Sequence, residues 1–376
     1  MVAKKVHEFF WLLILRQFSN GMNYEQELEE LLSTVAMQSA SDVHIAVGRY
    51  PTIRVDDALL PLSSKKILTP EDTESFAQVI MTKPQWEKFS LTNEIDLGYS
   101  FRDKARFRVN IFRQRSFVSI VMRLIPAHVK SIEELGLPPI LHEFTRHAQG
   151  FFLMVGPAGH GKSTTLAALI DEINHERADH ILTIEDPIEY LFQQDRSIID
   201  QREVGIDTKD FITALRSAFR QDPDVIMVGE MRDAETIGAA LTAAETGHLI
   251  FSTLHTNNAA QTIDRIIDTF PAEQQGQVRN QLAMTLTGVV SERLIPRLEG
   301  GRIPAIEVMI ATPAIRNLIR EKKTHEVDLV IETSADDGML SLNRSLAELA
   351  KKREISLENA ELYSSNAAEL RMLIGR

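Results

Sequence analysis

The 376-residue sequence contains no cysteine, and the apolar run near its N-terminus, Phe9–Leu15, is short. Without cysteine the chain forms neither disulfides nor thiolate metal sites, which fits a reducing cytoplasm. A membrane-spanning helix needs about 20 apolar residues, so this run does not cross a bilayer. Arg16 follows directly and no small-residue cleavage site appears, which argues against a secretory signal peptide.

Basic residues are also scarce relative to acidic ones: 41 Lys and Arg stand against 53 Asp and Glu, for a net charge of −12 at pH 7. This acidic balance argues against nucleic acid as the main partner. The composition, 44% apolar and 25% charged, is typical of a soluble protein, and the length suffices for two or three domains. We therefore expect a cytoplasmic protein of more than one domain.

Residues 1–21 precede the first clear helical pattern, which begins just after Met22. We interpret them as an N-terminal appendage without an assigned role, which a misassigned start codon would explain. The alternative is a tail that binds a membrane surface or a partner.

Residues 22–124 have the pattern of a small α+β domain with a mainly antiparallel sheet. Residues 23–38 carry apolar side chains at helical spacing, and a second helix places Phe76, Val79 and Ile80 on one face. Strand-like stretches occupy residues 43–47, 52–55, 97–101, 105–115 and 117–124. Residues 125–131 are interpreted as a linker, because proline near their start disfavours helix.

Residues 132–376 have the pattern of a nucleotide-binding α/β domain. Apolar strands alternate with helices, which predicts a parallel sheet covered on both faces. The strands are expected at residues 151–155, 181–185, 225–229 and 249–253. The last region, about 272–376, is expected to be nearly all helix with charged faces.

A complete phosphate-binding loop, G-x-x-x-x-G-K-S, follows the first of these strands and opens a helix. Its residues are Gly156, Pro157, Ala158, Gly159, His160, Gly161, Lys162, Ser163 and Thr164. The glycines let backbone N–H groups surround phosphate oxygens, and the helix N-terminus adds a positive field. We expect Lys162 to reach the β- and γ-phosphates of ATP and the Ser163 hydroxyl to ligate Mg²⁺.

Carboxylates stand at the ends of two later strands. Glu185, Asp186 and Glu189 lie at or just past one strand, and Glu230 ends another. Such ends border the ligand in a parallel sheet, and hydrolysis needs a carboxylate that orients and deprotonates water. Gly229 takes the place where these strands usually carry aspartate, so we expect Glu230 to hold Mg²⁺ or its water.

Two histidines flank the strand at 249–253. Their spacing places His248 and His255 near opposite ends of the strand, with His255 at the end expected to face phosphate. A histidine beside a buried strand is more often a satisfied core group than a catalyst.

Arginines crowd two strands of the first domain: Arg106, Arg108, Arg113, Arg115 and Arg123. Alternation puts Arg106 and Arg108 on the face opposite Phe107 and Val109. They form either a solvated basic face or arginine fingers that reach a neighbouring subunit's γ-phosphate.

Residues 312–321 predict an amphipathic helix with a capping Thr312 and a proline in its first turn. Ile315, Leu318 and Ile319 form its apolar face. This pattern leaves open whether the helix packs on a core or faces a partner.

Together these motifs resemble the secretion ATPases of type II secretion and type IV pilus systems, most closely the pilus-retraction branch. The resemblance covers about residues 22–365 and rests on Ser41–His44, Arg106–Asn110, the phosphate loop, Ile184–Glu189, Asp222–Asp233 and Thr253–Thr256. The segment Ala314–Glu321 is characteristic of the retraction branch, and the accessory and extension ATPases lack it in this form. Extension ATPases also usually carry a further N-terminal domain and a four-cysteine zinc motif, so no zinc is expected here.

The resemblance implies an α/β fold with a RecA-like P-loop ATPase core, a PAS-like N-terminal domain and a homohexameric ring with ATP at the subunit junctions. It assigns these side chains to the reaction: Glu189 as catalytic base, Glu230 in the Mg²⁺ and water shell, Arg108 and Arg123 as arginine fingers, His248 and His255 as γ-phosphate sensors. The loop interior Pro157–His160 departs from the family's usual Pro-Thr-Gly-Ser, but it mostly presents backbone, so binding is expected to survive. Residues 1–21 have no counterpart in the family.

The function expected from the resemblance is ATP-driven disassembly of a type IV pilus, which underlies twitching motility. Rotation of one subunit's N-terminal domain against the next subunit's core would drive the cycle. The implied partners are the platform protein of the inner membrane and the pilus machinery, at the cytoplasmic face. The alternatives are an accessory retraction ATPase, a type II secretion ATPase, a nucleotide-gated scaffold with negligible turnover, and a nucleic-acid translocase, which the acidic balance disfavours.

Overall fold

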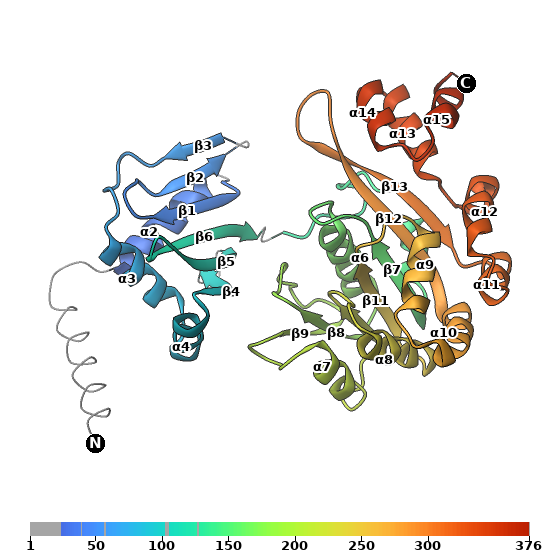
Figure 1. The fold of residues 1–376 in the computed structure, drawn as a ribbon, viewed down its shortest axis with the longest axis horizontal. Coiled ribbons are helices and arrows are strands. Elements are labelled where there is room, and N and C mark those ends of the chain that lie inside the picture. The colour runs from blue at the N-terminus through green and yellow to red at the C-terminus, as the bar shows by residue number, and fades with distance from the viewer. Residues whose placement is uncertain (1–23, 39, 56–57, 102–104, 126–127, 376) are drawn as a thin grey trace. The chain divides into compact units, whose positions relative to one another are not determined.

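The computed structural model describes residues 24–38, 40–55, 58–101, 105–125 and 128–375 (Figure 1). The chain divides into two compact units, residues 1–127 and 128–376. The predicted appendage and Pro126 of the predicted linker lie outside the described residues. Within the described ranges, no helix is long and apolar enough to cross a membrane.

The first unit is built on a six-stranded antiparallel sheet with the order β3-β2-β1-β6-β5-β4. The strands are β1 (Asp42–Ala46), β2 (Thr52–Val55), β3 (Ala58–Pro61), β4 (Glu94–Phe101), β5 (Ala105–Gln114) and β6 (Phe117–Ile125). The helices are α2 (Tyr24–Met37), α3 (Pro70–Ile80) and α4 (Lys83–Thr92). Sequence patterns missed β3, whose residues are all exposed, and α4, whose only buried residue is Phe89.

Alternation along β5 separates the two faces of this sheet, as predicted. Phe107, Val109 and Ile111 are fully buried against Leu32 of α2 and Phe76 of α3 within one apolar core. Arg108, between two of them, is exposed. The alternation along β5 and the antiparallel pairing of the sheet both confirm what the sequence predicted for this region.

The second unit is a seven-stranded sheet with the order β13-β12-β7-β11-β10-β8-β9. The strands are β7 (Gly150–Val155), β8 (His180–Glu185), β9 (Ile198–Glu203), β10 (Val225–Val228), β11 (Leu249–Leu254), β12 (Leu286–Pro296) and β13 (Arg302–Ile310). The helices are α5 (Leu141–Thr145), α6 (Lys162–Glu176), α7 (Phe211–Ala218), α8 (Ala234–Glu245), α9 (Ala259–Asp268) and α10 (Ala272–Thr285), then α11 (Pro313–Arg320), α12 (Val327–Thr333), α13 (Leu342–Lys351), α14 (Leu357–Tyr363) and α15 (Ala367–Ile374).

Helices cover both faces of this sheet, because its central strands are apolar on both sides. Phe151, Leu153 and Val155 of β7 pack into one core, which α8, α9 and α10 complete. Phe152 and Met154, the alternate residues, pack into a second core with α5 and α6. All pairings from β12 through β9 are parallel, as the sequence predicted for a buried α/β sheet.

The expectation of nearly continuous helix over 272–376 is wrong for residues 286–310. There β12 and β13 form a long antiparallel hairpin, and β12 also pairs parallel with β7. Gly300 and Gly301 turn the chain at φ 89° and 74°. Most of β12 is buried, so it lacks the polar alternation that marks a half-exposed strand.

Helix α11 packs on the core, which settles the alternative that the sequence left open. Ile315 and Ile319 are fully buried in the core that also holds α10 and α12 residues. The Arg316 guanidinium donates hydrogen bonds to the carbonyls of Ala311, Met284 and Leu286 at 2.9, 3.1 and 3.1 Å. Arg316 thus ties this helix to the junction between α10 and β12.

Replacing Arg316 with alanine is expected to lower the free energy of unfolding by ~1–3 kcal/mol, because three carbonyls lose their donor. Thermal denaturation measures the effect. The matched variant Arg320→Ala changes an exposed arginine of the same helix and should leave the melting temperature unchanged. Equal losses in the two variants would contradict the structural role of Arg316.

Candidate functional site

The phosphate loop joins β7 to α6 and lies against β12. Gly156 and Gly161 have φ values of 140° and 94°, which other residues rarely adopt. A Cβ atom on Gly156 would lie 2.4 Å from the Glu292 carbonyl oxygen, and one on Gly161 would lie 2.3 Å from Glu292 Oε1. Both glycines are therefore required by the loop's conformation and by its contact with β12.

Lys162 lies inside the loop, with only 7% of its surface exposed. Its Nζ donates hydrogen bonds to the carbonyls of Gly156 and Pro157, both at 2.8 Å. Burial lowers the pKa of Lys162, and the nearby carboxylates of Glu189, Glu230 and Glu292 act in the opposite direction. The ammonium is thus held at the centre of the loop.

The structure brings three of the predicted side chains to this lysine. His255 follows β11, and its Nδ1 lies 3.5 Å from Lys162 Nζ. The Nε2 atom of the same ring lies 3.7 Å from Glu230 Oε2, and Glu230 also pairs with Arg232. Glu189 interacts electrostatically with the lysine. The carboxyl ends of β7, β8, β10 and β11 thus converge on one site, as parallel pairing requires.

Buried Glu185 at the end of β8 holds the segment that carries Glu189. Its Oε1 accepts hydrogen bonds from Thr183 Oγ1 at 2.6 Å and Gln201 Nε2 at 3.2 Å, and its Oε2 accepts from Glu189 N–H at 3.3 Å. Burial raises the pKa of Glu185 to about 7. Among the acids of this segment, Glu185 is therefore structural, and Glu189 borders the phosphate loop.

Tyr190 also anchors this segment, and sequence patterns did not single it out. Its hydroxyl lies 2.9 Å from Thr164 Oγ1 at the start of α6. Burial raises the pKa of Tyr190, so the phenol keeps its proton for this hydrogen bond at neutral pH. No spacing rule in the sequence connects these two residues.

Gly229, which stands where such strands usually carry aspartate, lies close to the neighbouring strand β8. Its N–H donates to Ile184 O at 2.8 Å, and a Cβ atom would lie 3.2 Å from that same oxygen. The next acid along the chain, Asp233, caps α8 by accepting from Thr236 N–H at 2.8 Å. This leaves Glu230 as the carboxylate that the strand presents to the loop.

His248 is not brought to the phosphate loop of its own subunit. It precedes β11, whose six residues span about 20 Å, and His255 follows that strand. Its Nδ1 lies 2.9 Å from Ala243 O, and its ring meets Phe219 edge-on at 5.8 Å. The structure therefore does not place His248 at the phosphate loop of the same chain, and the γ-phosphate contact implied for it stays a prediction.

Glu292 on β12 belongs to the site although the sequence did not indicate it. Its Oε2 accepts from Thr165 Oγ1 at 2.8 Å, and burial raises its pKa to about 7 despite the nearby Lys162. The residue was missed because its segment was expected to be helix. Identifying a strand there would have placed it beside the loop.

Arg108 and Arg123 lie in the first unit, opposite each other on β5 and β6. Arg123 also pairs across the sheet with Asp42, whose Oδ1 accepts from its Nε at 2.8 Å. Arg54 of β2 lies opposite Asp42 on its other side. Asp42 and three arginines thus form a row across four strands, and two of these arginines, Arg108 and Arg123, are direct neighbours in it.

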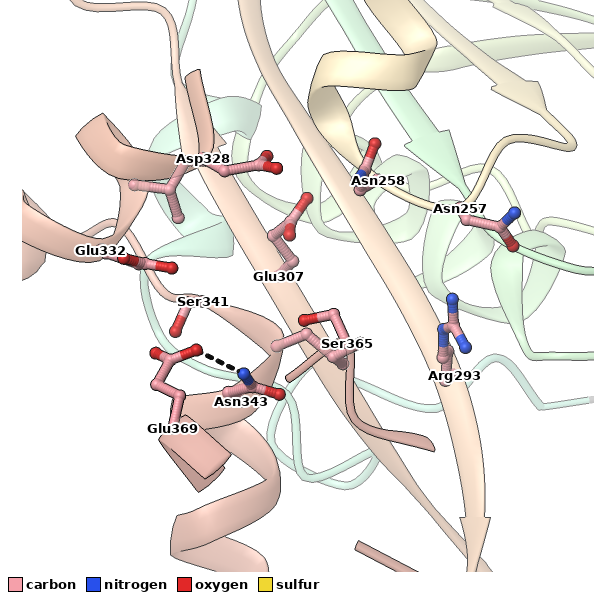
Figure 2. A pocket seen from close by; sticks show the side chains of 12 residues that line it. Asn257, Asn258, Arg293, Glu307, Asp328, Glu332, Ser341, Asn343, Ser365 and Glu369 are labelled. Carbon is pink, nitrogen blue, oxygen red and sulfur yellow. Dashed lines mark hydrogen bonds between the residues drawn. The ribbon is translucent and has the colours of Figure 1, made fainter. Parts of the chain in front are cut away.

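A cavity of about 450 Å³ is lined by residues of β12, β13 and the helices α12, α13 and α15, among others (Figure 2). Arg293, Glu307, Asp328 and Glu369 are among its charged lining residues. Neighbouring residues on a strand face opposite ways, so Glu292 meets the loop while Arg293 lines this cavity. Glu307 accepts from Ala259 N–H at 2.9 Å and thereby fixes the start of α9.

Comparison with known proteins places these features in one family. The model of the type II/IV secretion system protein family matches residues 20–303. The type IV pilus retraction ATPase PilT of Pseudomonas aeruginosa is 47% identical over 339 residues, covering 89% of this chain and 97% of that protein. The type IV pilus ATPase PilU of the same organism is 40% identical over 349 residues, covering 93% and 91%.

A solved structure agrees with this assignment. The crystal structure of the pilus retraction motor PilT with bound ADP matches with a TM-score of 0.86 and 45% identity, covering 92% of this chain and 98% of that one. The family match covers well over half of the chain. The protein therefore belongs to the type II/IV secretion system protein family.

Proposed function

We propose that this protein is a Mg²⁺-dependent ATPase that powers type IV pilus retraction as a homohexameric ring in the cytoplasm, at the inner-membrane base of the pilus. The observation that carries the proposal is the convergence of Glu189, Glu230 and His255 on Lys162 in a phosphate loop. Similarity to PilT and the segment Ala314–Glu321 favour retraction over an accessory role.

The loop binds the triphosphate through its backbone and Lys162. In the structure, Lys162 Nζ donates to the carbonyls of Gly156 and Pro157. On binding, phosphate oxygens take over these donors, while the N-terminus of α6 adds its positive field. Burial lowers the pKa of this lysine, and the carboxylates around it oppose that shift.

Ser163 and Glu230 are the groups suited to Mg²⁺. Ser163 is exposed on the first turn of α6, and Glu230 follows β10 at the same edge of the sheet. Protein sites for Mg²⁺ usually supply one or two oxygen ligands and leave the rest to phosphates and water. Bound with ATP, Mg²⁺ neutralises charge on the β- and γ-phosphates.

Glu189 acts as the base. It takes a proton from water while the water oxygen forms a bond to the γ-phosphorus, and the bond to the ADP oxygen breaks. Glu185 and Glu203 hold its segment, the latter by accepting from Ile188 N–H at 3.2 Å. This network holds the segment of the base through the backbone N–H groups of Ile188 and Glu189.

The arginines of a neighbouring subunit complete the site. Like charges that face each other across a sheet are destabilising, and Arg108 and Arg123 face each other on β5 and β6. An anion at Arg108 and Arg123 relieves this repulsion, which supports their role as arginine fingers. The antiparallel first unit then serves as the PAS-like domain that rotates against the next ATPase domain.

Glu189→Gln keeps the shape of the side chain but removes the proton acceptor. Steady-state phosphate release should fall ~10²–10⁴-fold while ATP affinity changes little. Asp195→Asn, which neutralises an exposed acid farther along the same segment, should retain activity. Absence of turnover in the native ring, or an unchanged rate in Glu189→Gln, would favour a nucleotide-gated scaffold.

Arg108→Ala should lower the rate ~10³–10⁵-fold if this arginine acts on the transition state. Mixing this variant with Glu189→Gln before ring assembly tests whether it acts in trans. Each junction that pairs an intact base with an intact neighbouring arginine regains activity, about a quarter of junctions in a random 1:1 ring. No recovery in mixed rings would contradict a shared site.

The direction of pilus movement is tested in cells of the native host. Replacing the gene by its Glu189→Gln form should abolish twitching while surface pili persist or accumulate, because assembly continues without disassembly. Loss of pili would instead indicate an extension ATPase. Normal pili with a secretion defect would indicate a type II secretion ATPase.

A further inference from the structure

The phosphate loop carries a histidine that its binding motif does not require. His160 occupies a variable position of G-x-x-x-x-G-K-S, where side chains are not needed for the backbone cradle. Its Nδ1 accepts a hydrogen bond from Leu294 N–H of β12 at 3.0 Å. The loop is therefore attached to β12 through a side chain of its own.

This hydrogen bond gives a partner to the Leu294 N–H, which does not pair with another strand on the β7 side of the sheet. β7 pairs with β12 only as far as the pair Val155 and Ser291. Leu294 lies beyond that pair, where no residue of β7 is in register. Leu294 is partly buried, and the His160 ring supplies its N–H with a partner in place of a strand.

A second contact joins the same two segments from the opposite direction. Glu292 reaches from β12 to Thr165 on α6 and packs beneath Gly161. Arg302 of β13 adds a hydrogen bond to Gly159 O at 3.4 Å. The β12–β13 hairpin thus holds the loop before and after the position of His160.

The hydrogen bond requires a neutral imidazole, because a protonated ring has no acceptor nitrogen. Burial lowers the pKa of His160, and the positive charges of Arg293, Arg302 and Lys162 lower it further. The group is therefore neutral at pH 7. At a pH below the ordinary pKa of histidine, protonation places an N–H on His160 Nδ1, which then faces the N–H of Leu294.

We propose that His160 is a positioning residue for nucleotide binding: its neutral imidazole holds the phosphate loop against β12, and protonation of that imidazole releases the loop. The inference rests on the proposed binding of ATP at this loop. The folded chain binds this proton less tightly than an unfolded histidine does. Lowering the pH therefore disfavours the attached loop, and raising the pH restores it.

The test compares ATP binding to full-length native protein, His160→Ala and His160→Asn between pH 5.5 and 8. Alanine removes the acceptor, whereas the asparagine Oδ1 replaces Nδ1 and does not titrate. At pH 7.5 the alanine variant should bind a fluorescent ATP analogue ~5–30-fold more weakly, and the asparagine variant close to normally. KM should follow these affinities while kcat changes little.

The pH profile separates positioning from a merely structural role. Affinity of the native protein should fall up to about tenfold per pH unit once His160 protonates. The ratio to His160→Asn at each pH cancels the titration of the nucleotide itself and should show the same fall. Parallel profiles for these two proteins would overturn the proposal, as would normal binding by His160→Ala at pH 7.5.

The outcomes also distinguish this inference from the proposed function. If the native protein binds no ATP at pH 7.5, the proposed function fails. If it binds ATP and His160→Ala binds equally well, only the role of His160 fails. Melting curves without nucleotide show whether each variant folds. If His160→Ala does not fold, the native-to-asparagine ratio still decides the question.

Discussion

The close approach of the phosphate loop to β12 is the constraint on which the nucleotide site depends. No Cβ atom fits at Gly156 or Gly161, because the backbone and carboxylate of Glu292 occupy that space. Positive φ values at both positions turn the loop around the Lys162 ammonium, which donates to two loop carbonyls. A shift of β12 would therefore disturb the lysine and the loop backbone together. The hairpin that includes β12 is in this sense part of the binding site and more than a support for the sheet.

The acidic residues around this contact have two different positions. Buried acids hold neighbouring chain segments through hydrogen bonds, and less buried acids face the nucleotide site. Glu185 is almost completely buried and accepts three hydrogen bonds that fix the start of the segment carrying Glu189. Gly229 allows two strands to approach, which leaves Glu230 to face Lys162 and His255. The carboxylates gathered here surround one buried ammonium, Lys162, and Glu230 also pairs with Arg232. A triphosphate in its transition state brings negative charge that further cations stabilise. The first unit places Arg54, Arg108 and Arg123 in a row with one acid, Asp42. The proposal that a neighbouring subunit completes the site starts from this row.

Local chemistry made much of this predictable. The glycine and lysine spacing identified the loop, the apolar strands predicted the parallel sheet, and alternation along β5 placed Arg108 opposite Phe107. Glu189, Glu230 and His255 could be predicted as neighbours because carboxyl ends of parallel strands meet at one edge. The misses have two different causes. Buried β12 shows no alternation, so it was expected to be helix, and Glu292 was missed with it. His248 was grouped with His255 by resemblance, although the length of β11 separates them.

The sequence by itself determined the chemistry of the loop, the class of sheet and the set of acids from which a base is drawn. These follow from backbone freedom at glycine, side-chain ionisation and periodicity, which are properties of neighbouring residues. Only the tertiary structure decided that Glu185 is structural, that Arg316 ties α11 to the α10–β12 junction, and that His160 and Glu292 connect the loop to β12. The contacts cited for Arg316, Glu292 and His160 join residues 32, 127 and 134 positions apart, whereas the role of Glu185 follows from its burial and from nearer partners. Sequence spacing carries no record of such distances, because they are set by how the strands and helices pack.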